Sequence, residues 1–518
     1  MLSIVKSMSL IGLDGYLINV EVDVSPGMPC FEIVGLPDTS VKESKERVKT
    51  AIKNSNLDLL SKKIIINLSP ANTKKEGSMF DLPIAIGVLI SNQNIKSKFI
   101  KEILQKTIFI GELSLDGNIN KVNGILPICI EAKKLGINNI VLPFENAKEA
   151  SIIDGISIFP ARNLLDVISF FYSNLKFEIN PQNINNFEIN SNYNIDFSEV
   201  KGQENVKRAL EISAAGNHNC LLIGSPGTGK TMIAKRLPTI LPSMTFEESL
   251  EVTKIHSISG TLSNKTPLIV TRPFRNPHHT ISPTSLVGGG RIPKPGEISL
   301  AHYGVLFLDE LPEFNKSTLE MLRIPLEDKK VTISRVNATV NFPCNFMLIA
   351  SMNPCPCGYF GSQEKNCTCS DEQIKKYINK ISGPLLDRID LHIEVNQVKY
   401  QNLNTNNSLS SSQIKKRVNF ARNLQYMRYK KYGIFSNSDL TPKLIEKYCV
   451  LNKNSKKILK SAFEKFNLSV RAYTKILKVA RTIADLDGAQ DIETCHIAEA
   501  IQYRSLDRYN AIEEGGKP

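Results

Sequence analysis

The sequence has no apolar run long enough to cross a membrane. A membrane-spanning helix needs about 18 or more consecutive apolar residues, and no stretch of this 518-residue chain reaches that length. The first residues, MLSIVKSMSLIGLDGYLINVEVDV, contain acidic side chains early and no small-residue cleavage site, which predicts that there is no signal peptide. We therefore expect a cytoplasmic protein without a membrane partner.

Cysteine is also sparse, with ten residues in the whole chain. This is too dilute for a disulfide scaffold and favours free or metal-bound thiols in a reducing compartment. Four of the ten fall in one stretch, SMNPCPCGYFGSQEKNCTCS, at Cys355, Cys357, Cys367 and Cys369. Four thiolates can complete the tetrahedral shell of one structural Zn²⁺. The C-x-C spacing is less specific than C-x₂-C, so reduced free thiols remain the alternative.

Acidic residues are fewer than basic ones, 51 against 64, and the formal net charge is +13. A basic surplus favours anionic partners, with nucleic acid first among them. The chain is also rich in Lys, Asn and Ile, as the translation of AT-rich DNA would be. Both interpretations of the charge, functional and compositional, stay open.

The chain is too long for one hydrophobic core, and about three domains are expected from its length. Two polar, Asn-rich stretches without helical periodicity, beginning near Ser173 and Gln401, are typical of linkers. Strand-like runs, KTIFIGELSL among them, alternate with helical runs before and between these stretches, and helical patterns follow. The predicted order is an α/β domain at 1–172, a linker at 173–197, an α/β core at 198–400 with a Cys-rich insert at 355–369, a linker at 401–412, and a helical domain at 413–510.

The strongest motif is CLLIGSPGTGKT, residues 220–231, in which an apolar strand runs into a glycine-rich loop and then a helix. This is the P-loop pattern in its required setting. Backbone N–H groups of such a loop converge on phosphate oxygens. Lys230 is expected to reach the β- and γ-phosphates, and Thr231 to offer its hydroxyl to Mg²⁺. The predicted nucleotide-binding residues are Gly224, Ser225, Pro226, Gly227, Thr228, Gly229, Lys230 and Thr231.

Two further apolar strands end in polar residues. GVLFLDEL ends in Asp309 and Glu310, a Walker B arrangement in which Asp309 holds the Mg²⁺ shell and Glu310 polarises the attacking water. NFMLIASMNP ends in Asn353, which can position that water or touch the γ-phosphate. Arg388 follows in KISGPLLDRIDLH. An amphipathic helix is predicted between Ser469 and Gly488, with an apolar face that includes Ile476 and Ala480. Arg471 lies in its first turn, where a cation is disfavoured by the helix dipole and indicates an anionic neighbour.

Together these motifs resemble AAA+ ATPases, and within them the magnesium-chelatase-like clade. FEIVGLPDTSVKESKERV, RPFRNPHHTISPTSLVGGG, SMNPCPCG and RAYTKILKVARTIADL are similar to the ComM/YifB family over nearly the whole chain. The resemblance implies ATP and Mg²⁺ as cofactors and an αβα core with a C-terminal helical lid. It also implies a homo-oligomeric ring, with six subunits typical of the family. Asn353 would then be sensor 1, Arg388 an arginine finger acting on a neighbour's ATP, and Arg471 sensor 2.

The family resemblance also implies a Lon-protease-like fold for residues 1–172. A working Lon site pairs a nucleophilic Ser with a Lys base. Ser78 lies about one position from the Ser motif, and Leu126 occupies the place of the lysine. We therefore predict no peptidase activity; substitution by Lys133 or Lys134 is the alternative.

DKKVTISRVNATVNFP predicts a hairpin with three basic residues, Lys329, Lys330 and Arg335. Hairpins of this kind grip DNA phosphate in related ring helicases, while the alternative is ordinary solvated charge. His278 and His279 have no carboxylate or Cys at ligand spacing in the sequence, which argues against a metal site there.

The first functional hypothesis is an ATP-driven DNA translocase. By family resemblance it would be a branch-migration helicase acting on recombination intermediates, including those of natural transformation. The motor subunit of a metal chelatase and a protein remodeller are the alternatives.

Overall fold

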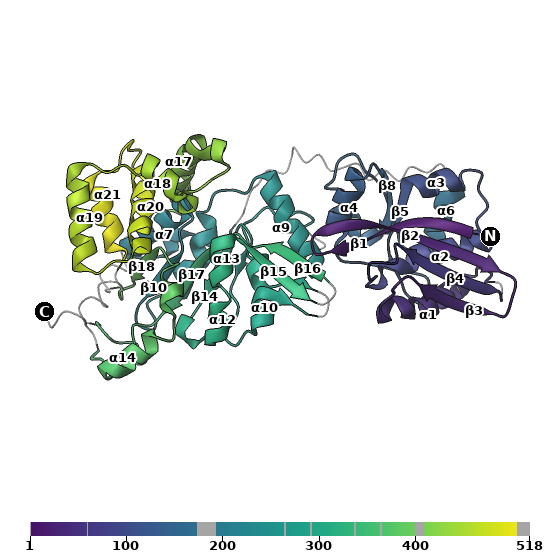
Figure 1. Ribbon diagram of the computed structural model, residues 1–518, viewed down its shortest axis with the longest axis horizontal. Coiled ribbons are helices and arrows are strands. Elements are labelled where there is room, and N and C mark those ends of the chain that lie inside the picture. Colours follow the sequence, from purple (N-terminus) through teal and green to yellow (C-terminus); the bar gives the residue numbers. More distant parts are fainter. Residues whose placement is uncertain are drawn as a thin grey trace.

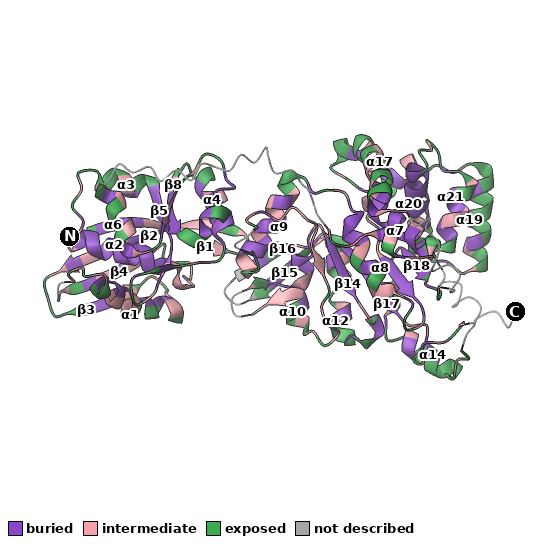
Figure 2. Ribbon diagram, turned by 180° about the vertical axis from the view of Figure 1, so that it is seen from behind, coloured by how far each residue is buried: buried purple, intermediate pink, exposed green. Residues whose placement is uncertain are grey.

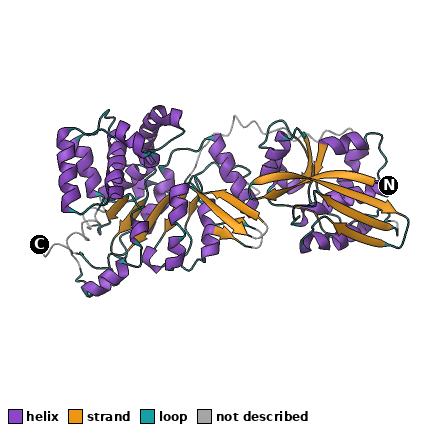
Figure 3. Ribbon diagram, viewed as in Figure 1, coloured by secondary structure: helices purple, strands orange, loops and turns teal. Residues whose placement is uncertain are grey.

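A computed structural model shows an elongated molecule with one sheet at the N-terminal end, a second sheet in the middle and a helical bundle at the other end (Figures 1 and 3). It describes residues 2–59, 61–172, 193–263, 266–290, 293–335, 338–362, 365–398 and 409–504. Most of both predicted linkers, and the chain end after residue 504, lie outside the described residues. Within the described part, no helix is both long and apolar enough to span a bilayer.

The N-terminal sheet has seven strands in the order β3-β4-β2-β1-β5-β8-β9. The long hairpin of β1 and β2 is antiparallel, while β5, β8 and β9 run parallel to β1 or to one another. The strands are β1 Leu2–Ile11, β2 Asp14–Ser25, β3 Cys30–Val34, β4 Lys63–Ser69, β5 Thr107–Phe109, β8 Asn139–Pro143 and β9 Ser157–Ala161, with the small pair β6 Glu112–Leu113 and β7 Ile119–Asn120 beside them. The helices are α1 Thr39–Asn54, α2 Asp81–Ser91, α3 Ile100–Lys106, α4 Ile125–Lys134, α5 Ala147–Ala150 and α6 Leu164–Tyr172.

The residue pattern of KTIFIGELSL predicts one continuous strand, but in the structure this stretch forms two short strands, β5 and β6. The chain leaves the sheet at Gly111, whose N–H donates to the Met79 carbonyl at 3.0 Å. A Cβ at this position would lie 2.7 Å from the Ile119 side chain. Tertiary contact with the β7 strand therefore overrides the local strand pattern.

The central sheet has five parallel strands in the order β11-β14-β17-β10-β18. The near-continuous apolar runs of the three central strands β14, β17 and β10 are buried, as expected for a parallel sheet covered on both faces (Figure 2). The strands are β11 Phe274–Arg275, β14 Val305–Leu308, β17 Met347–Met352, β10 Cys220–Ile223 and β18 Leu391–Glu394. The helices are α7 Glu204–Gly216, α8 Lys230–Arg236, α9 Phe246–Ser259, α10 Pro283–Val287, α11 Glu297–Leu300, α12 Lys316–Glu320, α13 Arg323–Asp328, α14 Asp371–Ile378 and α15 Gly383–Leu386.

Two small hairpins accompany this sheet. The first is β12 Gly288–Gly289 with β13 Lys294–Pro295, and the second is β15 Lys330–Arg335 with β16 Ala338–Pro343. The second hairpin is the one predicted from the sequence. Its apolar face is buried, and Val340 lies so close to the β1–β2 turn that a Cβ at Gly12 would be 2.3 Å from it. The hairpin therefore packs against the N-terminal part of the molecule.

Helix α9 and the residues just after it also contact the N-terminal part. The N–H of Gly124 donates to the Ser257 carbonyl at 3.2 Å, and the Ser257 hydroxyl donates to buried Glu149. The Lys121 ammonium donates to the Leu262 carbonyl at 3.4 Å. The first two bonds join the start of α4 and helix α5 to α9, and the third joins the segments just before α4 and just after α9. The N-terminal part is therefore docked by polar as well as apolar contacts.

The C-terminal helices are α17 Ser411–Tyr429, α18 Pro442–Tyr448, α19 Lys453–Lys465, α20 Val470–Leu486 and α21 Thr494–Gln502. Helix α20 is the one predicted between Ser469 and Gly488. The Ser469 side chain accepts from the N–H of Ala472, and Gly488 adopts a φ of +70° just beyond the last turn. The predicted apolar face, which includes Ile476 and Ala480, is buried. Both the helix and its orientation are therefore confirmed.

A buried ion pair joins the central sheet to α20. Asp390, just before β18, lies 2.6 Å from the Lys475 ammonium, accepts from the N–H of Asn219 at 3.1 Å, and is 3.3 Å from His218 Nδ1. Burial alone raises the pKa of the Asp390 carboxyl, but Lys475 and His218 outweigh it and hold this pKa well below its ordinary range. The native state is therefore stabilised by the ionised carboxylate.

Asp390→Asn is expected to lower the free energy of unfolding by about 3–5 kcal/mol at neutral pH, because it leaves the Lys475 charge buried without its partner. The carboxylate stabilises fully above its unfolded pKa of about 3.9, and this stabilisation is lost as the pH falls through the lower folded value. Urea unfolding at pH 7 and pH 3 should therefore show the deficit shrinking in acid.

Two controls accompany this measurement. Asp491→Asn, at an exposed position after α20, should change stability by no more than about 0.5 kcal/mol. Asp390→Asn combined with Lys475→Met removes both charges and should recover most of the loss. Equal stability of the wild type and Asp390→Asn at pH 7 would contradict the role of the pair.

Candidate nucleotide site

The P-loop connects β10 to α8 at the carboxyl edge of the central sheet, where open α/β sheets bind ligands. Gly224 donates its N–H to the Met352 carbonyl at 3.2 Å, and a Cβ there would lie 2.4 Å from the Val395 carbonyl oxygen. Gly227 and Gly229 adopt φ of +80° and +84°, a region that favours glycine. The glycine spacing of the motif is thus required by the backbone of this loop.

Lys230 brings two of the predicted motifs together. Its ammonium donates to the Gly224 and Ser225 carbonyls at 2.7 and 3.0 Å and to Asn353 Oδ1 at 3.2 Å. Burial lowers the pKa of Lys230, although Asp309 and Glu310 oppose that shift. The lysine therefore lies within the loop, beside the acidic pair and the asparagine at the end of β17.

Thr231 and Asp309, the two predicted Mg²⁺ ligands, are in direct contact. The Thr231 hydroxyl donates to Asp309 Oδ2 at 2.7 Å, and the Ser351 hydroxyl donates to Oδ1 of the same carboxylate. Ser351 also accepts the N–H of Glu310 at 3.3 Å. Ser351 was not predicted to belong to the site. The signal in the sequence was a single hydroxyl inside the otherwise apolar run of β17.

Glu310 projects from the end of β14 with a φ of +54° and a side chain that is 59% exposed. His279 Nδ1 lies 3.9 Å from its carboxylate, and His278 packs on His279 at 4.1 Å between ring centroids. The sequence does not predict this neighbour, because about 30 residues separate the two. The histidine faces the acid that is expected to polarise water.

Gln203 is a second residue that the motifs did not indicate. Its side-chain amide donates to the Thr228 carbonyl at 2.9 Å and to the Asn396 carbonyl at 3.1 Å. It thereby ties the P-loop to the segment after β18. Only its place just before α7 hinted at a role, and that signal is weak.

Arg388 and Arg471 lie at the opposite edge of the sheet, where β10, β17 and β18 begin. Both approach Glu327, Arg388 at 2.7 Å and Arg471 at 3.8 Å, and both line a cavity of about 490 Å³. Glu327 is thus the anionic neighbour expected for Arg471. The structure brings the two arginines together and keeps them away from Lys230 of the same chain, and the Arg388 Nε has no hydrogen-bond partner among the described residues.

The three basic residues predicted to contact DNA are placed differently from one another. The Lys329 ammonium pairs with Asp439 and lines the same cavity as Arg388. Lys330 is exposed at the start of β15. Arg335 ends that strand, and its side chain lies outside the described part. The structure therefore does not bring Lys329 to the hairpin tip.

Ser78 lies in a cavity of about 420 Å³ between the N-terminal sheet and the β15–β16 hairpin. Its hydroxyl donates to Glu112, and Lys74 and Lys121 line the same cavity. Lys134 instead pairs with Glu131 at 2.9 Å on α4, and Leu126 is fully buried. Neither of the lysines considered as a substitute base is among those that line this cavity.

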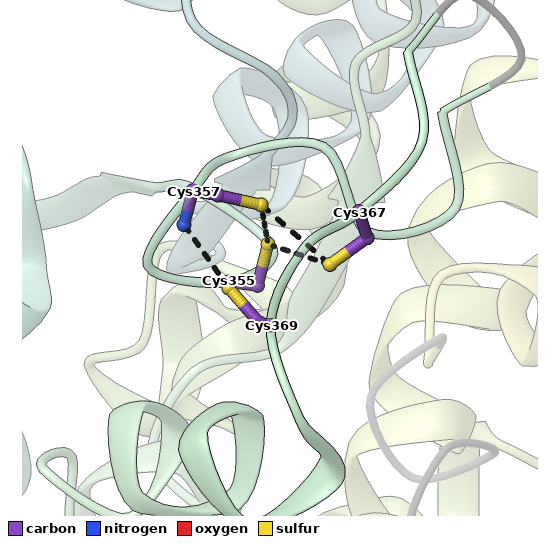
Figure 4. A group of neighbouring side chains, drawn as sticks. All are labelled: Cys355, Cys357, Cys367 and Cys369. Atoms are coloured by element: carbon purple, nitrogen blue, oxygen red, sulfur yellow. Dashed lines mark hydrogen bonds between the residues drawn. The ribbon is translucent and has the colours of Figure 1, made fainter.

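The four cysteines of the Cys-rich insert converge although nine residues separate the two pairs (Figure 4). Their sulfur atoms all lie within 4.8 Å of one another. All four are free thiols in the structure, and Cys355 is the buried one. The set can hold one metal ion. Hydrogen bonds from the backbone, that of Thr368 first, lower the pKa of Cys357 to about 5.

A glycine-rich loop between a strand and a helix, facing two acidic residues at the edge of a parallel sheet, is typical of P-loop nucleotide-binding proteins. Family models match three parts of the chain. "Magnesium chelatase, subunit ChlI" matches residues 196–403, "Subunit ChlI of Mg-chelatase" matches 20–146, and "Magnesium chelatase, subunit ChlI C-terminal" matches 408–504.

Two of the proteins similar to this chain match it over almost its whole length. The chain is 42% identical over 511 residues to competence protein ComM of Haemophilus influenzae, covering 98% of each chain. It is equally similar, again over 98% of both, to the uncharacterized protein YifB of Salmonella typhimurium. The 67 kDa magnesium-chelatase subunit of Chlorobaculum parvum is 26% identical over 164 residues, 31% of this chain and 23% of that protein.

The chain belongs to the ComM/YifB family of magnesium-chelatase-like AAA+ proteins, as its motifs predicted. Membership implies ATP and Mg²⁺ as cofactors. The model that matches residues 20–146 carries a magnesium-chelatase description, so the likeness of this part to Lon proteases stays a prediction.

Proposed function

We propose that the protein is a ring-forming ATPase that couples ATP hydrolysis to movement along branched DNA. The observation that carries this proposal is the separation of the site into two halves at opposite edges of one sheet. The P-loop, Asp309 and Asn353 form one half, while Arg388 and Arg471 lie at the other edge. A neighbouring subunit that presents its arginine edge to the P-loop would complete the site.

The roles of the residues follow from this arrangement. The P-loop N–H groups and Lys230 hold the phosphates, and Thr231 and Asp309 hold Mg²⁺. Glu310 and Asn353 orient water for attack on the γ-phosphate. Arg388 and Arg471 of a neighbour neutralise the charge that develops in the transition state. Because Glu327 occupies both arginines in the isolated chain, subunit contact has to exchange this ion pair for phosphate.

DNA as the partner is supported by the basic surplus of the chain and by its full-length similarity to a competence protein. Branch migration of recombination intermediates is an activity that a ring-shaped motor can perform, and it is consistent with the name of this relative, a competence protein. A chelatase motor subunit is the second proposal, favoured by the descriptions of the matching family models. Similarity to the chelatase subunit itself, however, extends over only 31% of the chain.

We propose the following domain division for this motor. Residues 1–172 form the accessory domain, with a Lon-like fold and no peptidase activity. Residues 198–400 form the αβα ATPase core, and residues 413–510 form the helical lid. The contacts of α9 with α4 and α5 hold the accessory domain against the core.

A four-way DNA junction is expected to stimulate ATP hydrolysis, and strand exchange on that junction should require ATP. Binding to phosphate releases counterions, so affinity should fall by about 10³-fold or more between 50 and 200 mM salt. Lys330→Ala should reduce the slope of log affinity against log salt by about 1 if Lys330 contacts phosphate. Lys457→Ala, at an exposed position on α19, is the matched control.

Two results would decide against this function. Absence of DNA binding at 50 mM salt would exclude the translocase. Recovery of a chelatase partner alone in a pull-down, with ATP hydrolysis insensitive to DNA, would favour the second proposal.

A further inference from the structure

We propose that Cys355, Cys357, Cys367 and Cys369 bind one Zn²⁺, and that the resulting zinc knuckle, residues 354–370, forms part of the wall of the nucleotide site and sets its affinity for nucleotide. The inference rests on nucleotide binding at the P-loop, but not on DNA or on ring formation. The Cys-rich insert would then be part of the ATP site and not of a separate surface.

The sulfur positions match a single tetrahedral ion. Cys355 and Cys357 are 3.3 Å apart, and the sulfur of Cys367 is 3.6 and 3.5 Å from theirs. A zinc ion with Zn–S bonds of about 2.3 Å holds its sulfurs about 3.8 Å apart. All four sulfurs lie within 4.8 Å of one another, so four protein ligands fill the shell and leave no open position. Such a closed site is structural.

Two backbone N–H groups already point at the sulfurs. Phe360 donates to Cys355 Sγ at 3.3 Å, and Cys357 donates to Cys369 Sγ at 3.4 Å. Hydrogen bonds of this kind orient metal ligands and stabilise thiolate charge. Thiolates gathered this closely repel one another without a cation between them. Soft sulfur ligands in tetrahedral array select zinc among the common cellular ions.

The knuckle touches the P-loop through Gly358. The Gly358 N–H closes a tight turn on the Cys355 carbonyl at 3.0 Å, with a φ of +85°. A Cβ on Gly358 would lie 2.6 Å from Cδ and 2.9 Å from Cγ of Pro226. The proline ring of the P-loop therefore rests directly on the backbone between two zinc ligands.

The other end of the knuckle is equally close to the site. Asn353, which accepts from Lys230, precedes Cys355 by two residues. A cavity of about 870 Å³ opens between Glu310, the knuckle and α14. Its lining includes Glu310, Asn353, Cys357, Cys369, Lys376 and Tyr377. The metal thus holds a segment that contacts the nucleotide site at both the P-loop and the end of β17.

The physical consequence is preorganisation. A phosphate-binding loop works because its N–H groups are held in one conformation before the ligand arrives. Bound zinc fixes Cys355, and with it Asn353 on one side of this cysteine in the chain and Gly358 on the other. Without zinc, the segment from 354 to 370 loses its cross-link, and the support of Pro226 is lost with it.

The first test measures metal and nucleotide together, without DNA. Full-length protein purified without chelators should contain one zinc per chain. Removal by a competing zinc chelator should weaken ADP binding by about tenfold or more, and added zinc should restore it. Absence of zinc, iron in its place, or equal ADP affinity with and without zinc would overturn the proposal. A chain that binds no ADP in either state would overturn the proposed ATPase as well, so the two failures are distinguishable.

The second test keeps all four cysteines, so that the knuckle stays folded. Gly358→Ala should retain zinc but weaken ADP binding, because the new Cβ displaces Pro226. Gly361→Ala is the matched control, since it has a similar φ of +73° and nothing within 4 Å of a Cβ. Pro226→Ala should make the further effect of Gly358→Ala much smaller, as a double-mutant cycle can show. Equal effects of Gly358→Ala and Gly361→Ala would contradict the contact as the route.

Discussion

Lys230→Ala should reduce the rate of ATP hydrolysis by about 10³-fold. The ammonium lies inside the P-loop, 2.7 Å from the Gly224 carbonyl and 3.2 Å from Asn353 Oδ1. It is therefore placed to meet charge on the transferred phosphoryl group, and the loss of one such preorganised donor costs about 10²–10³ in rate elsewhere. The loss of phosphate binding in the ground state reduces the rate of hydrolysis further. Phosphate release from ATP under saturating Mg²⁺ is the measurement.

The same substitution should not destabilise the fold. Burial lowers the pKa of Lys230, so keeping its ammonium protonated costs the native state free energy relative to the unfolded chain. Thermal unfolding without nucleotide should occur at the same or a slightly higher temperature than in the wild type. Lys235→Ala, an exposed lysine on the same helix, should leave both rate and stability unchanged. A Lys230→Ala protein with full ATPase activity would place the chemistry elsewhere.

Arg388→Ala should reduce ATP hydrolysis by about 10³–10⁵-fold, the effect typical of an arginine finger, while ADP affinity stays close to that of the wild type. The guanidinium lies at the amino edge of the sheet, opposite the P-loop. It is held by Glu327 at 2.7 Å, and its Nε lacks a partner among the described residues. It can therefore act on phosphate only in a neighbouring subunit. Arg323→Ala, which removes a nearby salt bridge with Glu320, is the control.

Mixing two inactive proteins tests the direction of this effect. Arg388→Ala subunits keep an intact P-loop, and Lys230→Ala subunits keep an intact arginine. If Arg388 acts across the subunit boundary, about a quarter of the interfaces in an equimolar random ring are complete, and activity should return. A mixture as inactive as its components would show that the arginine does not act in trans.

The sequence predicted one edge of the central sheet well. The apolar runs before the P-loop, before Asp309 and before Asn353 form the adjacent parallel strands β10, β14 and β17. Because parallel strands end at the same edge, three patterns far apart in the chain were enough to predict that Lys230, Asp309 and Asn353 are neighbours. The β15–β16 hairpin and helix α20 followed from equally local signals of alternation, capping and periodicity.

The N-terminal part shows the limit of local patterns. β1, which pairs with β2 over its whole length, did not stand out in the sequence, since a strand buried by its neighbours needs no strict alternation. The predicted strand over KTIFIGELSL breaks at Gly111 because of a contact with Ile119. His279 beside Glu310, and Ser351 between Asp309 and Glu310, also depend on packing, which a single pattern does not encode.

The sequence alone determined the family, the P-loop with its acidic partners, and the four cysteines as a candidate metal set, because each depends on residue types at short fixed spacing. Only the tertiary structure decided that Arg388 and Arg471 meet at Glu327 on the edge away from the P-loop. It alone placed Gly358 of the Cys-rich insert against Pro226. These contacts join segments that are far apart in the sequence and meet only when the helices and strands pack together. The free energy of this packing is distributed over the whole hydrophobic core, so no short motif encodes it.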